Sequence, residues 1–278
     1  YSIAIYIDTT KENNMPYLLI DIGNSRIKIA IATENERLAK TIMSTGLVIE
    51  EPLDEFILQY ITSHSFSIGS IRTALISSVV PEYNATITMA CSRLGIQALF
   101  LTHDIKIPLQ TAFSIPPMTG VDRLLLSYGA SILYEGAPCI VVSFGTATTF
   151  NCVENFTFQG GLIFPGVMQS LQSLLQNASQ LREMRIALHS KDAEDIHIAH
   201  TTEQSIELGI TQGFASMTEG LLEKLSRQFE HKPHYIAVGG MSTIISSYTT
   251  CFERVQEDLV LDAMWYLTQR EDISSLRM

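Results

Sequence analysis

A single carboxylate stands beside a glycine turn near the beginning of this 278-residue chain. Asp21 follows the apolar run 18–20, Gly23 and Asn24 form the turn, and residues 26–32 return with isoleucine at every second position. This period of two predicts a half-buried strand, so the whole stretch predicts a β-hairpin. The carboxylate is costly to place there unless it is paired or holds a metal ion. The turn offers backbone N–H groups that can bind phosphate oxygens.

The same layout is repeated later in the chain, at residues 140–153, where an apolar run, a glycine turn and a β-branched strand follow one another. Two similar hairpins predict two related domains that face each other across a nucleotide cleft. Such a phosphate clamp is similar to that of the actin-like ATPase and sugar kinase superfamily. The matching positions are Asp21 with Ser143, Gly23 with Gly145, and Asn24 with Thr146.

Asp122 and Arg123 follow Gly120 between the two halves and form the second group of residues that could do chemistry. Phosphoryl transfer depends mostly on positioning and on neutralising charge. A carboxylate can accept the proton of a nearby hydroxyl group, and the planar guanidinium of arginine suits an anionic carboxylate. Taken alone, the pair could also be an exposed salt bridge at the start of a helix. Asp21 alone could likewise cap a turn through its side chain.

The composition is that of a compact protein, with 46% hydrophobic and 17% charged residues, and it excludes a disordered chain. The net charge of −11 argues against nucleic acid as a partner, because nucleic-acid binding needs a basic face. No apolar run has the length of a membrane span, so no membrane partner is expected. The four cysteines are widely spaced in apolar surroundings and predict reduced, buried thiols in a cytoplasmic protein. Residues 1–14 lack signal-peptide features and are interpreted as an N-terminal extension.

The remaining segments predict an α/β protein with an N-terminal domain at 15–118 and a C-terminal domain at 119–278. The first is expected to have the order β-β-β-α-β-α-β of a ribonuclease H-like unit, and the second to repeat it, with mixed β-sheets flanked by helices. Residues 202–229 predict one long helix or two abutting helices. The other expected elements are strands at 38–43, 71–80, 98–102, 160–166 and 235–242 and helices at 52–61, 81–94, 167–177 and 258–267.

Five motifs in a fixed order give the chain a resemblance to a known family. They lie at residues 21–25, 77–81, 119–124, 145–149 and 160–166. With these motifs the chain resembles type III pantothenate kinases from about Met15 to the C-terminal helix. The resemblance implies ATP-dependent phosphorylation of pantothenate to 4′-phosphopantothenate, the first step of coenzyme A synthesis. It also implies an actin-like fold, a homodimer, Mg²⁺, and a monovalent cation, K⁺ or NH₄⁺.

The resemblance further implies roles for individual residues. Asp122 would be the general base, Arg123, Gly120 and Thr202 would contact pantothenate, and Asp21 and Ser143 would stand at Mg²⁺. Apart from the resemblance, Lys28 has the length to reach a phosphate, but the favoured interpretation of this residue is the solvated side of a strand. The residues implied to bind the nucleotide are Asp21, Gly23, Asn24, Ser25, Lys28, Gly145, Thr146, Thr148, Gly239 and Gly240.

The chain departs from the family pattern at Ser143, where the family has aspartate. A serine hydroxyl can bind a metal-bound water but carries no charge, so cation binding is expected to be weaker. This leaves open a catalytically weak homologue that acts as a nucleotide-binding or regulatory protein. A kinase for another hydroxylated acid is also open, because phosphate motifs do not select the acceptor. His197 and His200 are interpreted as surface residues, since zinc needs further ligands.

Overall fold

The structure, a computed structural model, describes residues 15–38, 40–45, 52–102, 104–112, 119–190 and 198–270. It divides into two compact units. Unit 1 is the chain up to Ile105 together with the residues from Leu267 on, and unit 2 is Lys106–Tyr266. The extension predicted at residues 1–14 lies outside the described residues.

Unit 1 is built on a sheet with the strand order β3-β2-β1-β4-β5. The first three strands are antiparallel neighbours, and β4 and β5 are parallel to β1. The order along the chain confirms the β-β-β-α-β-α-β pattern, with one added 3₁₀ turn. The elements are β1 (Tyr17–Ile22), β2 (Arg26–Ala32), β3 (Thr41–Ser44), α1 (Leu53–Ser63), the turn η2 (Ile68–Ser70), β4 (Thr73–Ser78), α2 (Pro81–Arg93) and β5 (Gln97–Phe100).

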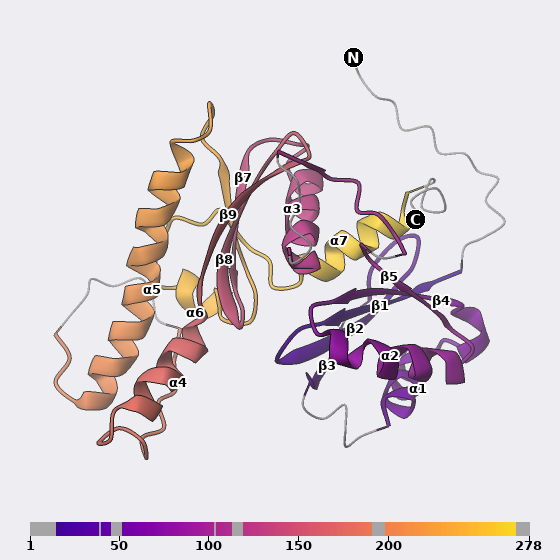
Figure 1. Ribbon diagram of the computed structural model, residues 1–278, viewed down its shortest axis with the longest axis horizontal. Helices are drawn as coiled ribbons and strands as arrows, with labels where there is room; N and C mark the ends of the chain where they lie inside the picture. The colour runs from indigo at the N-terminus through magenta and orange to yellow at the C-terminus, as the bar shows by residue number, and fades with distance from the viewer. Residues whose placement is uncertain are drawn as a thin grey trace. The chain divides into compact units, whose positions relative to one another are not determined.

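One face of the unit 1 sheet is covered by α1 and α2 (Figure 1). Ile20 and Ile29 pack there against Ile57 of α1 and Ile87 of α2, and all four are fully buried. Side chains alternate between the two faces of a strand, so Asp21 points to the face away from these helices. The alternation of the first hairpin therefore places its carboxylate outside the main core of the unit.

Unit 2 repeats this arrangement with the strand order β11-β10-β7-β8-β9-β6. The β7–β8–β9 strands are antiparallel neighbours, and β10 and β11 continue the sheet in parallel, as β4 and β5 do in unit 1. The elements are β6 (Gln110–Thr111), α3 (Val121–Leu133), β7 (Cys139–Phe144), β8 (Ala147–Glu154), β9 (Thr157–Pro165), α4 (Val167–Asn177), α5 (Thr202–Ser226), β10 (His234–Val238), α6 (Ser242–Ser246), β11 (Arg254–Val255) and α7 (Leu259–Thr268).

Helices cover both faces of the unit 2 sheet (Figure 1). On one face, Leu126 of α3 and Leu259 at the start of α7 pack on Val141. On the other face, α4, α5 and α6 pack on the intervening residues of the same strands, such as Val142 and Phe150. The two sheets flanked by helices confirm the predicted α/β class.

Two details differ from the expectation. Strand β3 begins at Thr41 instead of residue 38, and the small elements β6, α6 and β11 were not expected. Of the two alternatives expected at 202–229, the structure has the single long helix, at residues 202–226, because tertiary packing of its apolar face outweighs the cost of the internal glycines. Among the described helices, none combines the length and apolar character that crossing a bilayer requires.

Candidate functional site

In unit 1, Asp21 lies near the end of β1 between two polar neighbours on adjacent strands. The hydroxyl Oγ of Ser77 donates a hydrogen bond of 3.0 Å to Asp21 Oδ1. Lys28 lies directly across from Asp21 in the β1–β2 ladder, and Ser77 is its partner in the β1–β4 ladder. Asp21 is half-buried and Ser77 is fully buried. The carboxylate is therefore oriented by the sheet and supported by a polar neighbour, as a residue that faces phosphates or a cation requires.

The turn after Asp21 is fixed by backbone contacts. The N–H of Gly23 donates to the carbonyl of Arg26 at 2.9 Å, and the hydroxyl of Thr45 donates to the carbonyl of Gly23 at 2.7 Å. The N–H of Thr45 donates to the carbonyl of Ser25 at 3.1 Å. Asn24 and Ser25 are exposed at the tip. The turn thus has a fixed shape and presents polar groups to solvent, which suits the predicted contact with a phosphate.

The second hairpin has the same topology but a different chemistry at the matching position. Ser143 lies near the end of β7, with Thr149 across from it on β8 and Val238 beside it on the parallel strand β10. The position that holds a carboxylate between Lys28 and Ser77 in unit 1 is therefore flanked here by a hydroxyl and an apolar side chain. All three members of the unit 2 group are uncharged.

The second turn is also one residue shorter than the first. Three residues, 145–147, separate the paired Phe144 and Thr148, whereas four residues separate the paired Ile22 and Ile27 in the first hairpin. The N–H of Gly145 donates to the carbonyl of residue 147 at 3.1 Å. As a result Thr148 takes the buried strand position that Ile27 has in unit 1. The hydroxyl of Thr148 has no hydrogen-bond partner among the described residues.

Two glycines from other elements approach the second turn closely. A Cβ atom on Gly166, which precedes α4, would collide with the carbonyl oxygens of Gly145 and Thr146. A Cβ atom on Gly239, after β10, would lie 2.8 Å from the carbonyl oxygen of Phe144, and Gly239 has a φ of +92°. Both positions therefore require glycine. Gly240 follows as an exposed turn residue. Unit 2 thus gathers the 145–146 turn, the start of α4 and the 239–240 turn in one place.

The predicted general base lies at the start of α3. Gly120 precedes the helix with an extended backbone, and Asp122 lies in the first turn, where the helix dipole favours a negative charge. Burial raises the pKa of Asp122 above its usual range, while the backbone N–H and the guanidinium charge of Arg123 oppose the rise. A carboxylate in such surroundings accepts a proton more readily than an exposed one.

Arg123 is turned toward the sheet. Its Nε donates a hydrogen bond of 2.7 Å to Oδ1 of Asn151, which is fully buried on β8, and its guanidinium lies 5.4 Å from the centre of the Phe158 ring. Burial lowers the pKa of Arg123, and the charge of Asp122 opposes that change. The nitrogen Nη2 is buried and has no hydrogen-bond partner among the described residues. Arg123 therefore has a donor available for an anionic ligand.

Thr202 does not lie with these residues. It is exposed at the first position of α5, and α5 and α3 cover opposite faces of the unit 2 sheet (Figure 1). A pocket of about 490 Å³ opens on the α5 side, and its lining includes Ile198 and Ser205 but neither Asp122 nor Arg123. Within the unit, the structure thus brings Gly120, Asp122 and Arg123 together and leaves Thr202 on the other side.

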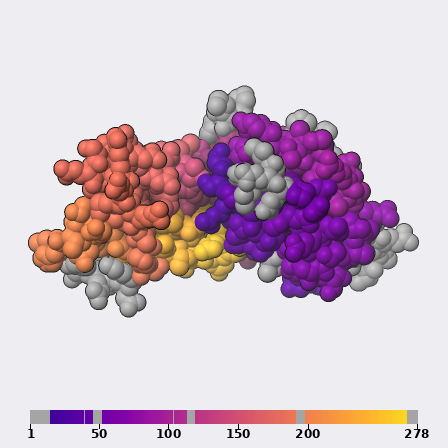
Figure 2. Space-filling model, turned by 90° about the horizontal axis from the view of Figure 1, so that it is seen from below, coloured from indigo at the N-terminus to yellow at the C-terminus, as the bar shows by residue number. Residues whose placement is uncertain are grey.

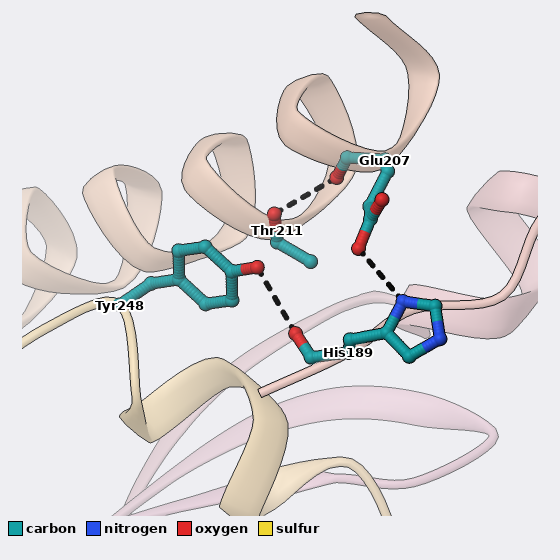
Figure 3. A network of polar contacts seen from close by, with 4 residues as sticks. All are labelled: His189, Glu207, Thr211 and Tyr248. Carbon is teal, nitrogen blue, oxygen red and sulfur yellow. Dashed lines mark hydrogen bonds and ion pairs between the residues drawn. The ribbon is translucent and has the colours of Figure 1, made fainter. Parts of the chain in front are cut away.

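The loop before α5 is attached to the body of unit 2 by a polar network around His189 (Figure 3). Its Nδ1 lies 3.1 Å from Oε1 of Glu207 on α5, and its carbonyl oxygen accepts a hydrogen bond of 3.0 Å from the hydroxyl of Tyr248. Thr211 donates to the carbonyl oxygen of Glu207 one turn further along α5. His200 is exposed, and His197 lies outside the described residues. No cluster of three metal-ligating side chains occurs in the described part of the chain.

Two residues that support the site, Ser77 and Asn151, have no role predicted from the sequence. Ser77 enters the sequence prediction only within the motif at 77–81, and Asn151 only within the repeated hairpin at 140–153. A signal for Asn151 was present, because an amide in the apolar, β-branched run of β8 must find hydrogen-bond partners once it is buried. Neither partner could be named from the sequence, since both contacts join segments that are distant in the chain.

Comparisons with known proteins identify the family. The family model of type III pantothenate kinase matches residues 17–224. The type III pantothenate kinase of Nitratidesulfovibrio vulgaris (strain Miyazaki F) is 36% identical over 259 residues, which is 92% of this chain and 98% of the relative. That of Lawsonia intracellularis is 34% identical over 90% of this chain and 94% of the relative.

Solved structures show the same fold at low sequence identity. The ethanolamine utilization protein EutJ from Carboxydothermus hydrogenoformans is similar with a TM-score of 0.52, at 11% identity over 91% of this chain and 88% of that one. Component A of the (R)-2-hydroxyglutaryl-CoA dehydratase of Acidaminococcus fermentans has a TM-score of 0.50, at 12% identity over 90% and 94% of the two chains. The fold is that of the actin-like ATPases, as expected, and by its sequence the chain belongs to the family of type III pantothenate kinases.

Proposed function

We propose that this protein transfers the γ-phosphoryl group of ATP to the hydroxyl group of pantothenate, giving 4′-phosphopantothenate for coenzyme A synthesis. Membership of the family supports the reaction. The observation that carries the proposal for this chain is the pair at the start of α3. A carboxylate whose pKa is raised by burial adjoins a guanidinium with one donor nitrogen that has no partner among the described residues.

The two residues suit the two ends of pantothenate, which has a carboxylate at one end and a primary hydroxyl at the other. Arg123 binds the carboxylate through its available donor. Asp122 accepts the hydroxyl proton as the hydroxyl oxygen bonds to phosphorus and the bond from phosphorus to the ADP oxygen breaks. Gly120 allows the backbone to approach the substrate closely. The chemistry then requires only positioning and charge neutralisation from the remaining residues.

Both hairpin turns bind the phosphates of ATP in this proposal. Gly23, Asn24 and Ser25 contribute the fixed, exposed turn of unit 1, and Lys28 adds a positive charge on the same face as Asp21. In unit 2, the phosphate contacts come from Gly145, Thr146 and Thr148, and the turn at 239–240 contacts the nucleoside. The glycine-only positions near the second turn support this assignment, because they bring backbone close to it.

Asp21 is the carboxylate best suited to Mg²⁺, because its orientation is fixed by Ser77 and it stands beside a phosphate-binding turn. Mg²⁺ in proteins keeps several waters and uses one or two carboxylates, so a single Asp21 with the neutral Ser143 fits a site that is mostly hydrated. When bound, the ion neutralises charge on the phosphates. A requirement for a monovalent cation, K⁺ or NH₄⁺, is part of the proposal through the family.

A homodimer is the assembly that the surface of unit 2 supports. Large apolar side chains of β9 and α4 are exposed in one stretch of sequence, among them Ile163 at 66% and Phe164 at 44%. Figure 2 shows α4, in salmon, at the surface of the unit. Exposed apolar surface of this kind marks an interaction site. In a homodimer, Thr202 of one copy could contact the pantothenate that is bound at Asp122 of the other copy. Thr202 would then take part in substrate binding although it lies away from Asp122 within its own unit.

The cytoplasm is the proposed compartment, because coenzyme A synthesis uses ATP there and the four cysteines are free thiols. Nothing in the comparisons favours the alternative of a catalytically weak homologue. In this proposal, Ser143 weakens the binding of the cation and does not abolish the reaction. A kinase for another hydroxylated acid is the outcome to exclude by experiment.

The test is an ATP-coupled assay of the full chain with pantothenate, with Mg²⁺ and with and without K⁺. The product is identified by mass spectrometry, and other hydroxy acids serve as alternative acceptors. The proposal expects ADP and phosphopantothenate in equal amounts and a preference for pantothenate. Nucleotide binding without turnover on any acceptor would contradict it, and so would a faster reaction with a different acid.

A further inference from the structure

We propose that Asn151 is a positioning residue that holds the guanidinium of Arg123 in place for the carboxylate of pantothenate. Because its amide is neutral, it does so without using up the positive charge of Arg123. This inference rests on the proposed function. It adds to that function a residue on β8 that does not itself contact the substrate or the reacting atoms.

The orientation of the Asn151 amide is fixed by the two acceptors that its NH₂ group contacts. Its Nδ2 donates to the hydroxyl oxygen of Thr149 at 3.0 Å and to the carbonyl oxygen of Val141 at 3.5 Å. Both partners accept hydrogen bonds from the NH₂ group, so the amide oxygen must occupy the other side. Asn151 is fully buried, where an unpaired amide would be costly. The oxygen Oδ1 is therefore directed at Arg123 by contacts within the sheet.

The guanidinium of Arg123 is fixed by two contacts of different kinds. Nε donates to Asn151 Oδ1 at 2.7 Å, and the ring of Phe158 lies 5.4 Å from the guanidinium carbon. A planar guanidinium held through one nitrogen and over one aromatic face has a defined direction for its remaining donors. The nitrogen Nη2 is buried and has no partner among the described residues. This nitrogen is thus presented in one direction before any ligand binds.

The neutrality of Asn151 matters because Arg123 already has one carboxylate nearby. Among the groups that act on its pKa, Asp122 is the acidic one that supports the charged form most. A second carboxylate at position 151 would lie against Nε and satisfy the guanidinium charge within the protein. The carboxylate of the substrate would then meet a neutralised site and a repelling neighbour. An amide supplies the same acceptor geometry and leaves the charge available.

Two substitutions separate orientation from charge. Asn151→Asp keeps the shape and the acceptor but adds the charge, and Asn151→Ala removes the acceptor. Val153→Ala is the matched control, because Val153 is also fully buried on β8 on the face that α3 covers. Steady-state kinetics would give kcat and the KM values for pantothenate and ATP, and thermal unfolding would give Tm for each variant.

The inference expects the KM for pantothenate to rise about tenfold in Asn151→Ala and at least as much in Asn151→Asp, as loss of one charged hydrogen bond predicts. The KM for ATP should stay within about twofold. Val153→Ala should lower Tm without changing either KM. An unchanged KM for pantothenate in Asn151→Asp would contradict the role of neutrality. If Asn151→Ala only lowered Tm, as the control does, the positioning role would be wrong.

A spectroscopic measurement tests the contact without turnover. The Nε–H resonance of Arg123, assigned by its loss in Arg123→Lys, should be protected from exchange in the wild type, shift on addition of pantothenate, and disappear in Asn151→Ala. Absent turnover together with a protected resonance would contradict the proposed function and keep the contact with Asn151. An exchanging resonance in the wild type would overturn the inference, whatever the enzyme phosphorylates.

Discussion

Asp21 Oδ1 accepts a hydrogen bond of 3.0 Å from Ser77 Oγ on the neighbouring parallel strand. The corresponding pair in the repeated hairpin is Ser143 and Val238, which share the same ladder position on β7 and β10. The two halves thus keep one topology while only the first keeps a carboxylate and its hydroxyl donor. This asymmetry supports the proposal that Asp21, and not Ser143, has the main role at a divalent cation.

The first prediction concerns this pair. Asp21→Asn removes the charge and is expected to lower kcat/KM for ATP by about ten- to a hundredfold, as loss of a charge-assisted interaction predicts. Ser77→Ala removes only the supporting hydrogen bond, of about 1 kcal/mol, and should cost about fivefold. The measurement is the initial rate as a function of ATP concentration, repeated at several concentrations of Mg²⁺. If Ser77→Ala lost more activity than Asp21→Asn, the carboxylate would not be the functional member.

The second prediction concerns Ser143. Its ladder neighbours, Thr149 and Val238, are uncharged, so neither would neutralise a carboxylate placed there. Ser143→Asp is therefore expected to lower the Mg²⁺ concentration that gives half-maximal activity. Ser143→Asn is the control of the same size without a charge, and it should leave that concentration unchanged. Equal responses of the two variants would show that charge at this position does not limit cation binding.

The third prediction concerns the apolar surface of β9 and α4. The wild type should have a mass in solution of about twice the chain mass of 30.9 kDa. Ile163→Asp places a charge on this surface and should shift the protein to monomers, because an unpaired charge is costly in an interface. Met89→Asp is the control, since Met89 of α2 is also exposed, at 55%. Light scattering after gel filtration measures both. A monomeric wild type, or dissociation by the control alone, would contradict the dimer.

The fourth prediction follows from the buried thiols. Burial raises the pKa of Cys91 and Cys139 to about 12 and that of Cys152 to about 11. Because the thiolate is the reactive form, these three residues should react slowly with a disulfide reagent at pH 8 in the native protein and rapidly in denaturant. Each pKa is higher in the folded than in the unfolded chain, so the protonated thiols stabilise the fold up to pH 9, and this is lost as the pH rises toward 12. Rapid reaction of more than one of the four thiols in the native protein would contradict the burial of Cys91, Cys139 and Cys152.

Much of the fold could be predicted from local sequence. The alternation in the first hairpin, the helix beginning at Pro81 and the helix at 167–177 are set by short-range patterns, and the structure confirms them. The short strands at 110–111 and 254–255 could not be predicted, because two-residue strands have no periodicity and exist only through their partners. The nucleotide cleft expected from the sequence stays a prediction.

The site shows the same division between local and distant information. Asp122 and Arg123 are adjacent, so the chain itself brings them together. The contacts that support the site, from Ser77 to Asp21 and from Arg123 to Asn151, join residues 56 and 28 positions apart. Only the register of the strands and the packing of α3 on β8 create them. The shorter second turn, which moves Thr148 to a buried position, likewise depends on the pairing of β7 with β8.

The most direct test of the account is the activity of Asp122→Asn beside the wild type, over a range of pH, with ATP, Mg²⁺ and pantothenate. Burial raises the pKa of Asp122. The wild-type kcat/KM for pantothenate should therefore fall on the acid side with an apparent pKa above that of an ordinary aspartate. The account predicts that Asp122→Asn keeps its Tm and loses kcat by about a hundred- to ten-thousandfold, as expected for a general base. A variant that phosphorylated pantothenate at nearly the wild-type rate would contradict it.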